Sequence, residues 1–150
     1  IQPALSRVDR WEKETIKQLN QFLQGNYMAI HTYDKYIQRI DDESIKKTLQ
    51  TIQQNHKKHA AMIAERIQNL GGIPAHDVSF SGKVAEWIGT MKGTFETKDI
   101  LKDAIAGEKR GIEKSKQLLD GSLDSKSFIL VTHILNEDEK HIKWLEQYLH

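Results

Sequence analysis

Two histidines stand three residues apart in the stretch NHKKHAAM at 55–62, inside a segment rich in helix-forming residues. Residues three apart lie on the same face of a helix, so His56 and His59 share a face. The apolar residues of this segment recur at spacings of three and four and mark the buried face: Ile45, Leu49, Ile52, Ile63, Ile67 and Leu70. Both histidines lie on that stripe, whereas Lys57 and Lys58 lie off it. We therefore expect two imidazoles in the core, where each needs a polar partner.

Three further segments show an apolar stripe interrupted by polar residues. The interrupting residues all fall near the middle of their segments: Asn26, Glu108, Asp138 and His141. In an antiparallel bundle of helices of similar length, the midpoints meet in one layer. These residues are therefore expected to lie close to His56 and His59.

Each of these polar residues has an ordinary structural explanation when it is taken alone. A core histidine can be satisfied by a neighbour, an inward asparagine can fix helix register, and a carboxylate at the stripe's edge can reach water. Together they would place several buried polar groups in one layer, and an uncompensated buried charge costs several kcal/mol. A cation would satisfy all of them, and three imidazoles with two carboxylates form a donor set suited to a first-row metal. A metal-free polar network is the alternative.

The pattern of apolar residues predicts four long helices that position this layer. The first covers residues 6–40, and the second runs from the turn at 41–44 to residue 70. The third covers 98–119, with Thr97 as its N-cap, and the fourth runs from 124 to the C-terminus. Gly71 and Pro74 end the second helix. The connection at 71–97 is long, and five apolar residues predict a short helix within it: Phe80, Val84, Trp87, Ile88 and Met91.

Short first and third connections with a long second one predict an all-α, antiparallel four-helix bundle of ferritin-like connectivity, formed by a single domain over residues 1–150. Lys and Arg number 22 and Asp and Glu 21, which argues against a nucleic-acid partner. No apolar run is long enough to cross a membrane. Because cysteine is absent and no signal peptide is evident, we expect a cytoplasmic protein.

All four helical segments resemble the ferritin-like di-iron carboxylate family, and locally bacterioferritin. The stretches that carry the resemblance are LNQFLQGNYMAIHTY, HKKHAAMIAERIQNLGGIPA, AIAGEKRGIE and ILNEDEKHIKWLE. The sequence is also similar to small, uncharacterised ferritin-like proteins with stress-linked expression, of the type named as domains of unknown function.

The resemblance implies a metal role for each polar position. Asn26 stands at a ligand glutamate of the family, and His56 and His59 stand at its Glu-x-x-His motif. Glu108 matches the glutamate of the third helix. Asp138 and His141 match the second Glu-x-x-His motif. The resemblance also places Tyr33 near the metals.

This chain departs from the family pattern of four carboxylates and two histidines, because Asn26 and His56 replace carboxylates. One or two metal ions are therefore implied, with iron favoured and zinc or manganese as alternatives. Lys57 stands where bacterioferritin has its haem-ligand methionine, so we expect no haem. No fifth helix follows the fourth, which favours a homodimer over a cage.

The function expected from these residues is metal binding at an atypical, histidine-rich site, with a role in iron handling or oxidative stress. One alternative is a redox-silent zinc or manganese site. Another is a metal-free bundle that serves as an interaction or structural module through the apolar stripe at 80–91. Of the other histidines, His31 is a candidate neighbour of the site, and His133 is expected to face solvent.

Overall fold

Four long helices form the protein in this computed structural model, which describes residues 7–77 and 96–150. Helix α1 covers Arg7–Gln38 and α2 covers Glu43–Asn69. Helix α4 covers Thr97–Leu119, α5 covers Ser125–Glu146, and a 3₁₀ turn, η1, covers Gln147–Leu149. The short helix predicted within 71–97, on the stripe Phe80 to Met91, lies outside the described residues.

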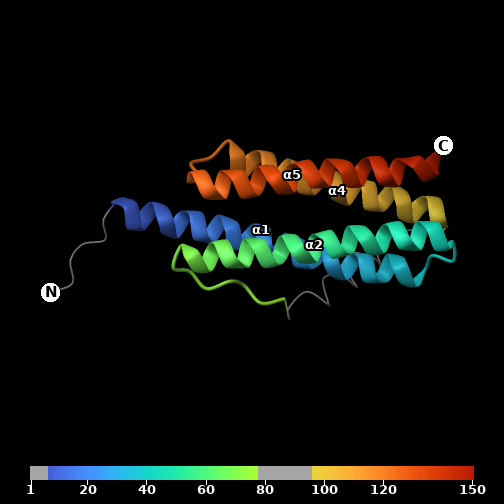
Figure 1. Ribbon diagram of the computed structural model, residues 1–150, viewed down its shortest axis with the longest axis horizontal. Helices are drawn as coiled ribbons and strands as arrows, with labels where there is room; N and C mark the ends of the chain where they lie inside the picture. The colour runs from blue at the N-terminus through green and yellow to red at the C-terminus, as the bar shows by residue number, and fades with distance from the viewer. Residues whose placement is uncertain (1–6, 78–95) are drawn as a thin grey trace.

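The helices pair as two antiparallel hairpins (Figure 1). Helix α1 packs mainly against α2, and α4 mainly against α5, while α2 contacts α5 and α1 contacts α4 across the bundle. Because α2 ends and α4 begins at opposite ends of the bundle, the chain must travel its length between them (Figure 1). This is the long connection of the ferritin-like bundle, as predicted.

The helix ends follow from local side-chain chemistry. The carboxylate of Asp42 accepts a hydrogen bond of 2.9 Å from the backbone N–H of Ile45 and so caps α2, and Asp124 caps α5 in the same way. Gly71 adopts φ 87°, the left-handed conformation that glycine tolerates best, directly after α2. The prediction of Thr97 as an N-cap is wrong by one residue, because the extended residue before α4 is Glu96.

Two apolar clusters fill the bundle, one towards each end. One contains Tyr33, Tyr36, Ile40, Ile45, Leu49, Ile52, Ile100, Leu101, Ala104, Ile105 and Leu145. The other contains Leu19, Phe22, Leu23, Ile30, Ala60, Ile63, Ile67, Leu130, Val131 and Ile134. On α1, α2 and α5 the residues of the two clusters are separate in sequence, and the buried residues Thr32, His56 and Asp138 are among the polar residues between them. On α4 the buried Glu108 follows the residues of the first cluster, whereas Asn26 of α1 lies within the second cluster, between Leu23 and Ile30. The predicted polar layer is therefore present at the middle of the bundle.

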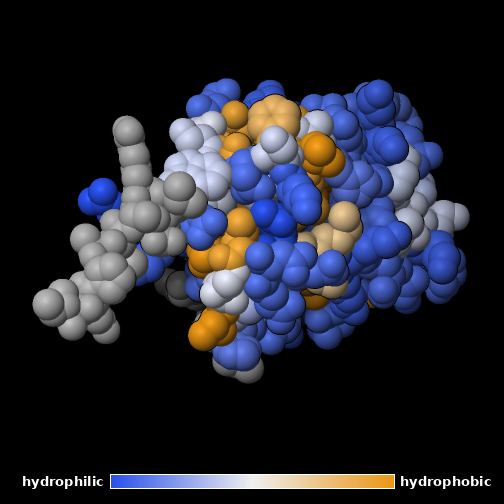
Figure 2. Space-filling model, turned by 60° about the vertical axis from the view of Figure 1, so that its left-hand side comes forward, coloured by the Kyte–Doolittle hydropathy of each residue, from blue (hydrophilic) through white to orange (hydrophobic). Residues whose placement is uncertain are grey.

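The surface of the described part is mostly polar. Among large apolar residues, Ile73, Phe128 and Ile129 are exposed. Figure 2 brings forward the end at which α2 finishes and shows small apolar patches separated by hydrophilic side chains. Within residues 7–77 and 96–150, no helix is long and apolar enough to cross a membrane.

Candidate metal centre

Glu108 lies at the centre of the polar layer, on α4, with 3% of its surface exposed. Its Oε1 lies 2.8 Å from Nε2 of His56 on α2. Its Oε2 lies 3.4 Å from Nδ1 of His141 on α5. One carboxylate therefore joins three helices through two imidazoles, both of which are buried.

Asp138 lies one helical turn before His141 on α5 and points to the same place. Its Oδ1 lies 3.5 Å from Nδ1 of His141 and 4.0 Å from Nδ1 of His56. This buried oxygen nevertheless has no hydrogen-bond partner among the described residues. A buried carboxylate oxygen without a donor is costly, so it marks a position where a cation would be favourable.

His56, Glu108, Asp138 and His141 each offer one ligand atom, and these four atoms lie within 4.8 Å of one another. Metal–nitrogen and metal–oxygen bonds are about 2 Å long, so small side-chain rotations would bring all four atoms onto one ion. Two imidazole nitrogens and two carboxylate oxygens suit a first-row divalent cation. The residues present therefore fit a metal.

The electrostatics of the cluster favour ionised carboxylate and imidazolium. Burial alone would raise the pKa of Glu108, but His56 and His141 outweigh it and hold the pKa well below its ordinary value. Burial would lower the pKa of His141, yet Asp138 and Glu108 raise it to about 9. The pKa of Asp138 is raised by its burial and by the nearby charge of Glu108. A cation entering the cluster would therefore replace a proton on His141.

Two residues outside the donor set hold it in place. The hydroxyl of Tyr33 on α1 donates a hydrogen bond of 2.7 Å to Oε1 of Glu108, and burial raises the pKa of this phenol. The amide of Asn55 on α2 lies 3.1 Å from Nε2 of His141. When both ring nitrogens of His141 carry protons, Asn55 must present its oxygen to Nε2, because the ring then has only donors.

His59 is buried beside the cluster but is not one of its four donors. Its ring centroid lies 6.0 Å from that of His56 and 6.3 Å from that of His141. Burial and the neighbouring histidines lower its pKa to about 3, so the ring is neutral near pH 7. Asn26 is also buried, but its amide donates to the backbone oxygen of Phe22 in its own helix.

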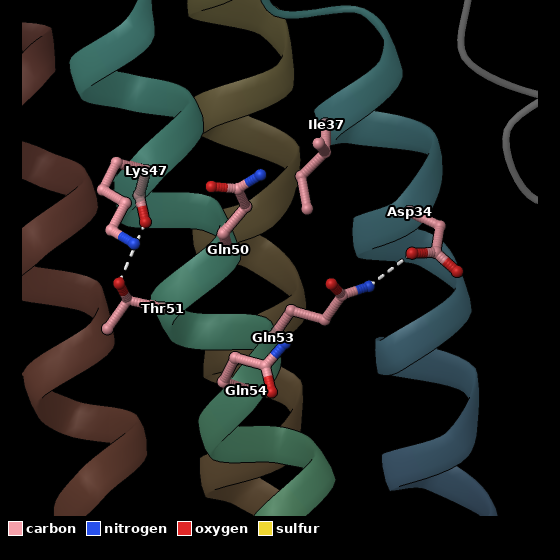
Figure 3. A pocket seen from close by; sticks show the side chains of 7 residues that line it. All are labelled: Asp34, Ile37, Lys47, Gln50, Thr51, Gln53 and Gln54. Carbon is pink, nitrogen blue, oxygen red and sulfur yellow. Dashed lines mark hydrogen bonds between the residues drawn. The ribbon is translucent and has the colours of Figure 1, made fainter.

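A polar hollow of about 390 Å³ lies on the α1–α2 side of the bundle (Figure 3). Gln53 reaches across it and donates to Asp34 at 2.6 Å and to the backbone oxygen of Ile30 at 2.9 Å. None of the four cluster donors lines this hollow. The cluster thus lies within the bundle, and the hollow is a separate surface feature.

The structure brings together four of the six residues predicted as ligands, and it places Tyr33 beside them. Sequence reasoning missed Asn55 as a partner of His141. Asn55 is 86 residues away from His141 in the sequence, and no motif or spacing links the two. Only the packing of α2 against α5 reveals this contact.

The fold and the buried cluster together define a ferritin-like four-helix-bundle protein with a candidate metal site in its central layer. The chain belongs to the family described as domain of unknown function DUF2383, whose model matches residues 14–121. The comparison with curated proteins gives no match.

Solved structures confirm the ferritin-like fold. The bacterioferritin-related dodecameric thioferritin of Bacteroides fragilis matches with a TM-score of 0.79 and 23% identity, over 92% of this chain and 85% of that one. Desulfovibrio desulfuricans bacterioferritin, whose structure describes a diiron site, matches with a TM-score of 0.77 and 25% identity, over 97% of this chain and 82% of that one. A Vibrio cholerae DPS protein of the ferritin-like diiron-carboxylate superfamily matches with a TM-score of 0.77 and 18% identity, over 100% of this chain and 99% of that one. The expected superfamily is therefore confirmed by the fold.

Proposed function

We propose that this protein binds a first-row divalent metal ion in the His56–Glu108–Asp138–His141 cluster and uses it in iron handling or the response to oxidative stress. The observation that carries the proposal is the group of four buried ligand atoms within 4.8 Å, one of which belongs to Asp138, whose Oδ1 is unpartnered among the described residues. Iron is the favoured ion because the similar Desulfovibrio protein is described with a diiron site.

The roles of the residues follow from their positions. Glu108 and Asp138 supply negative charge, and His56 and His141 supply neutral nitrogen donors once His141 has lost its second proton. Tyr33 and Asn55 hold Glu108 and His141 in their orientations. The bundle keeps water away from all four donors, since each is at most 5% exposed. Bound iron would supply one-electron exchange between its ferrous and ferric states.

Elemental analysis of protein purified without chelator or histidine tag tests the binding. We expect iron, manganese or zinc at about one equivalent, and its loss in His56→Ala protein that is still folded by circular dichroism. Absence of metal from both proteins, even after reconstitution with Fe(II) and Zn(II), would contradict the proposal. Faster oxidation of Fe(II) by oxygen than in buffer would support the redox role.

A redox-silent zinc or manganese site is the second candidate function. The observation that favours it is the donor set itself, in which His56 occupies a position where the family pattern has a carboxylate. Fewer carboxylates neutralise less metal charge, and zinc accepts mixed histidine and carboxylate ligands in a tetrahedral arrangement. Bound zinc that raises the melting temperature, without any acceleration of Fe(II) oxidation, would distinguish this function from the first.

A further inference from the structure

His59 is not one of the four donors of the buried cluster. It is 2% exposed, and its Nδ1 is buried without a hydrogen-bond partner among the described residues. A buried imidazole nitrogen that lacks a partner carries a desolvation penalty, which the cluster neither offsets nor explains.

A second histidine lies directly against it. The ring of His133 on α5 packs edge-on to the ring of His59 on α2, with centroids 5.9 Å apart and planes at 83°. His133 is half exposed, with 47% of its side chain open to solvent. The pair thus runs from the buried layer of the bundle to its surface.

A carboxylate completes the set. Glu137 lies one helical turn after His133, on the same face of α5. Its Oε1 lies 3.8 Å from Nε2 of His133, while its Oε2 lies 3.9 Å from the ammonium of Lys140. Oε1 therefore lies near His133, while Lys140 pairs with the other oxygen.

We propose that His59, His133 and Glu137 form a second cation position, between α2 and α5, for a divalent first-row ion such as Zn²⁺, Co²⁺ or Fe²⁺. Two imidazoles and one carboxylate with a side open to water match the ligand types and number that such ions accept. Among the described residues these three do not already form a converging group of ligand atoms, as the four of the buried cluster do. His133 and Glu137 lie partly in solvent, so both have room to rotate onto an ion held about 2 Å from each nitrogen.

This position shares no donor with the buried cluster, so it does not rest on the proposed function. It would hold its ion on the solvent side of His59, one imidazole ring away from His56 and His141. The ion would then give the buried Nδ1 of His59 the partner that it lacks among the described residues.

Equilibrium dialysis of the tag-free, metal-stripped protein against Co²⁺, with visible absorption to report the ligands, tests the proposal. The wild type should bind one more equivalent than His133→Ala or Glu137→Gln. His76→Ala removes an exposed histidine elsewhere and should bind as the wild type does. Both His133 and Glu137 lie near the surface, and circular dichroism should show that their variants stay folded.

Equal stoichiometry and equal Co²⁺ spectra in the wild type and His133→Ala would overturn the second position, whatever the buried cluster does. Failure of the buried cluster would look different, because Glu108→Gln would then bind as many ions as the wild type. The experiment therefore distinguishes failure of the second position from failure of the buried cluster.

Discussion

The hydroxyl of Tyr33 donates a 2.7 Å hydrogen bond to Oε1 of Glu108, joining α1 to α4 across the bundle. Nε2 of His56 lies 2.8 Å from the same oxygen, and His141 lies near the other oxygen of the carboxylate. All four helices thus meet at one buried carboxylate. Each contact to it should influence both the stability of the bundle and the affinity for metal.

Tyr33→Phe removes one donor to Glu108 and keeps the ring in the core. Hydrogen bonds to charged groups contribute about 1.5–3 kcal/mol, so we expect the free energy of unfolding of the metal-free protein to fall by about 2 kcal/mol. Urea denaturation measures it. Tyr27→Phe, at a half-buried position on the same helix, is the control and should change it little. An unchanged value in Tyr33→Phe would show that the bond contributes nothing.

Glu108→Gln replaces the carboxylate that touches both imidazoles with a neutral group of the same size. The loss of one anionic ligand should weaken Zn²⁺ or Fe²⁺ binding by about 100-fold or more. Isothermal titration calorimetry measures the affinity. Glu113→Gln is the matched control, since Glu113 is exposed on the same helix. Similar losses in both variants would mean that general charge, rather than ligation, governs binding.

Asn55→Leu removes the group that orients His141. Partners of ligating histidines typically change metal affinity by about 10- to 100-fold, so we expect a loss in that range. Asn55→Asp should restore or exceed wild-type affinity, because a carboxylate accepts the Nε2 proton more strongly and makes the ring a better donor. Weaker binding in Asn55→Asp than in Asn55→Leu would contradict the orienting role.

The stability of the metal-free protein should depend on pH through His141. Its pKa is raised from the ordinary value of 6.5 to about 9 in the folded protein, so its contribution is complete below about pH 6.5 and is lost as the pH rises through 9. The free energy of unfolding should therefore fall by an amount on the order of 3 kcal/mol between these limits. Urea denaturation with chelator present measures it, and His141→Gln should lack the slope.

Metal affinity should change with pH in the opposite direction. Binding requires His141 to release its second proton, so affinity should increase as the pH rises towards 9. Titrations in buffers of different ionisation enthalpy would show the released proton at pH 7. A binding enthalpy that is independent of the buffer would mean that His141 is already neutral.

The polar layer could be predicted from the sequence because helix period and burial are coupled. His56, Glu108 and His141 each interrupt an apolar stripe near its middle, and antiparallel packing brings these midpoints together. The expected bundle and its connectivity follow from the same period and from the lengths of the connections. Helix ends shifted by one or two residues, as at Thr97, because the cap depends on local backbone geometry.

The side-chain directions within the layer could not be predicted. Asn26 shares the stripe but satisfies its amide on the backbone of its own helix, which a period of 3.6 residues cannot show. The sequence places His133 in solvent, and the structure leaves it half exposed. Its ring nevertheless packs edge-on against the ring of the buried His59. Such contacts depend on the rotation of α5 against α2, and that rotation is set by packing.

The polar layer also divides the interior into two apolar halves that share no buried residue. Each half has its own cluster of large side chains, and the links between them are Glu108 and its partners. We therefore expect the two halves to unfold as separate cooperative units, linked by Glu108 and its partners. Without a cation the amide protons of the two halves should exchange at different rates, and a bound ion that ties α2, α4 and α5 together should make the halves open as one.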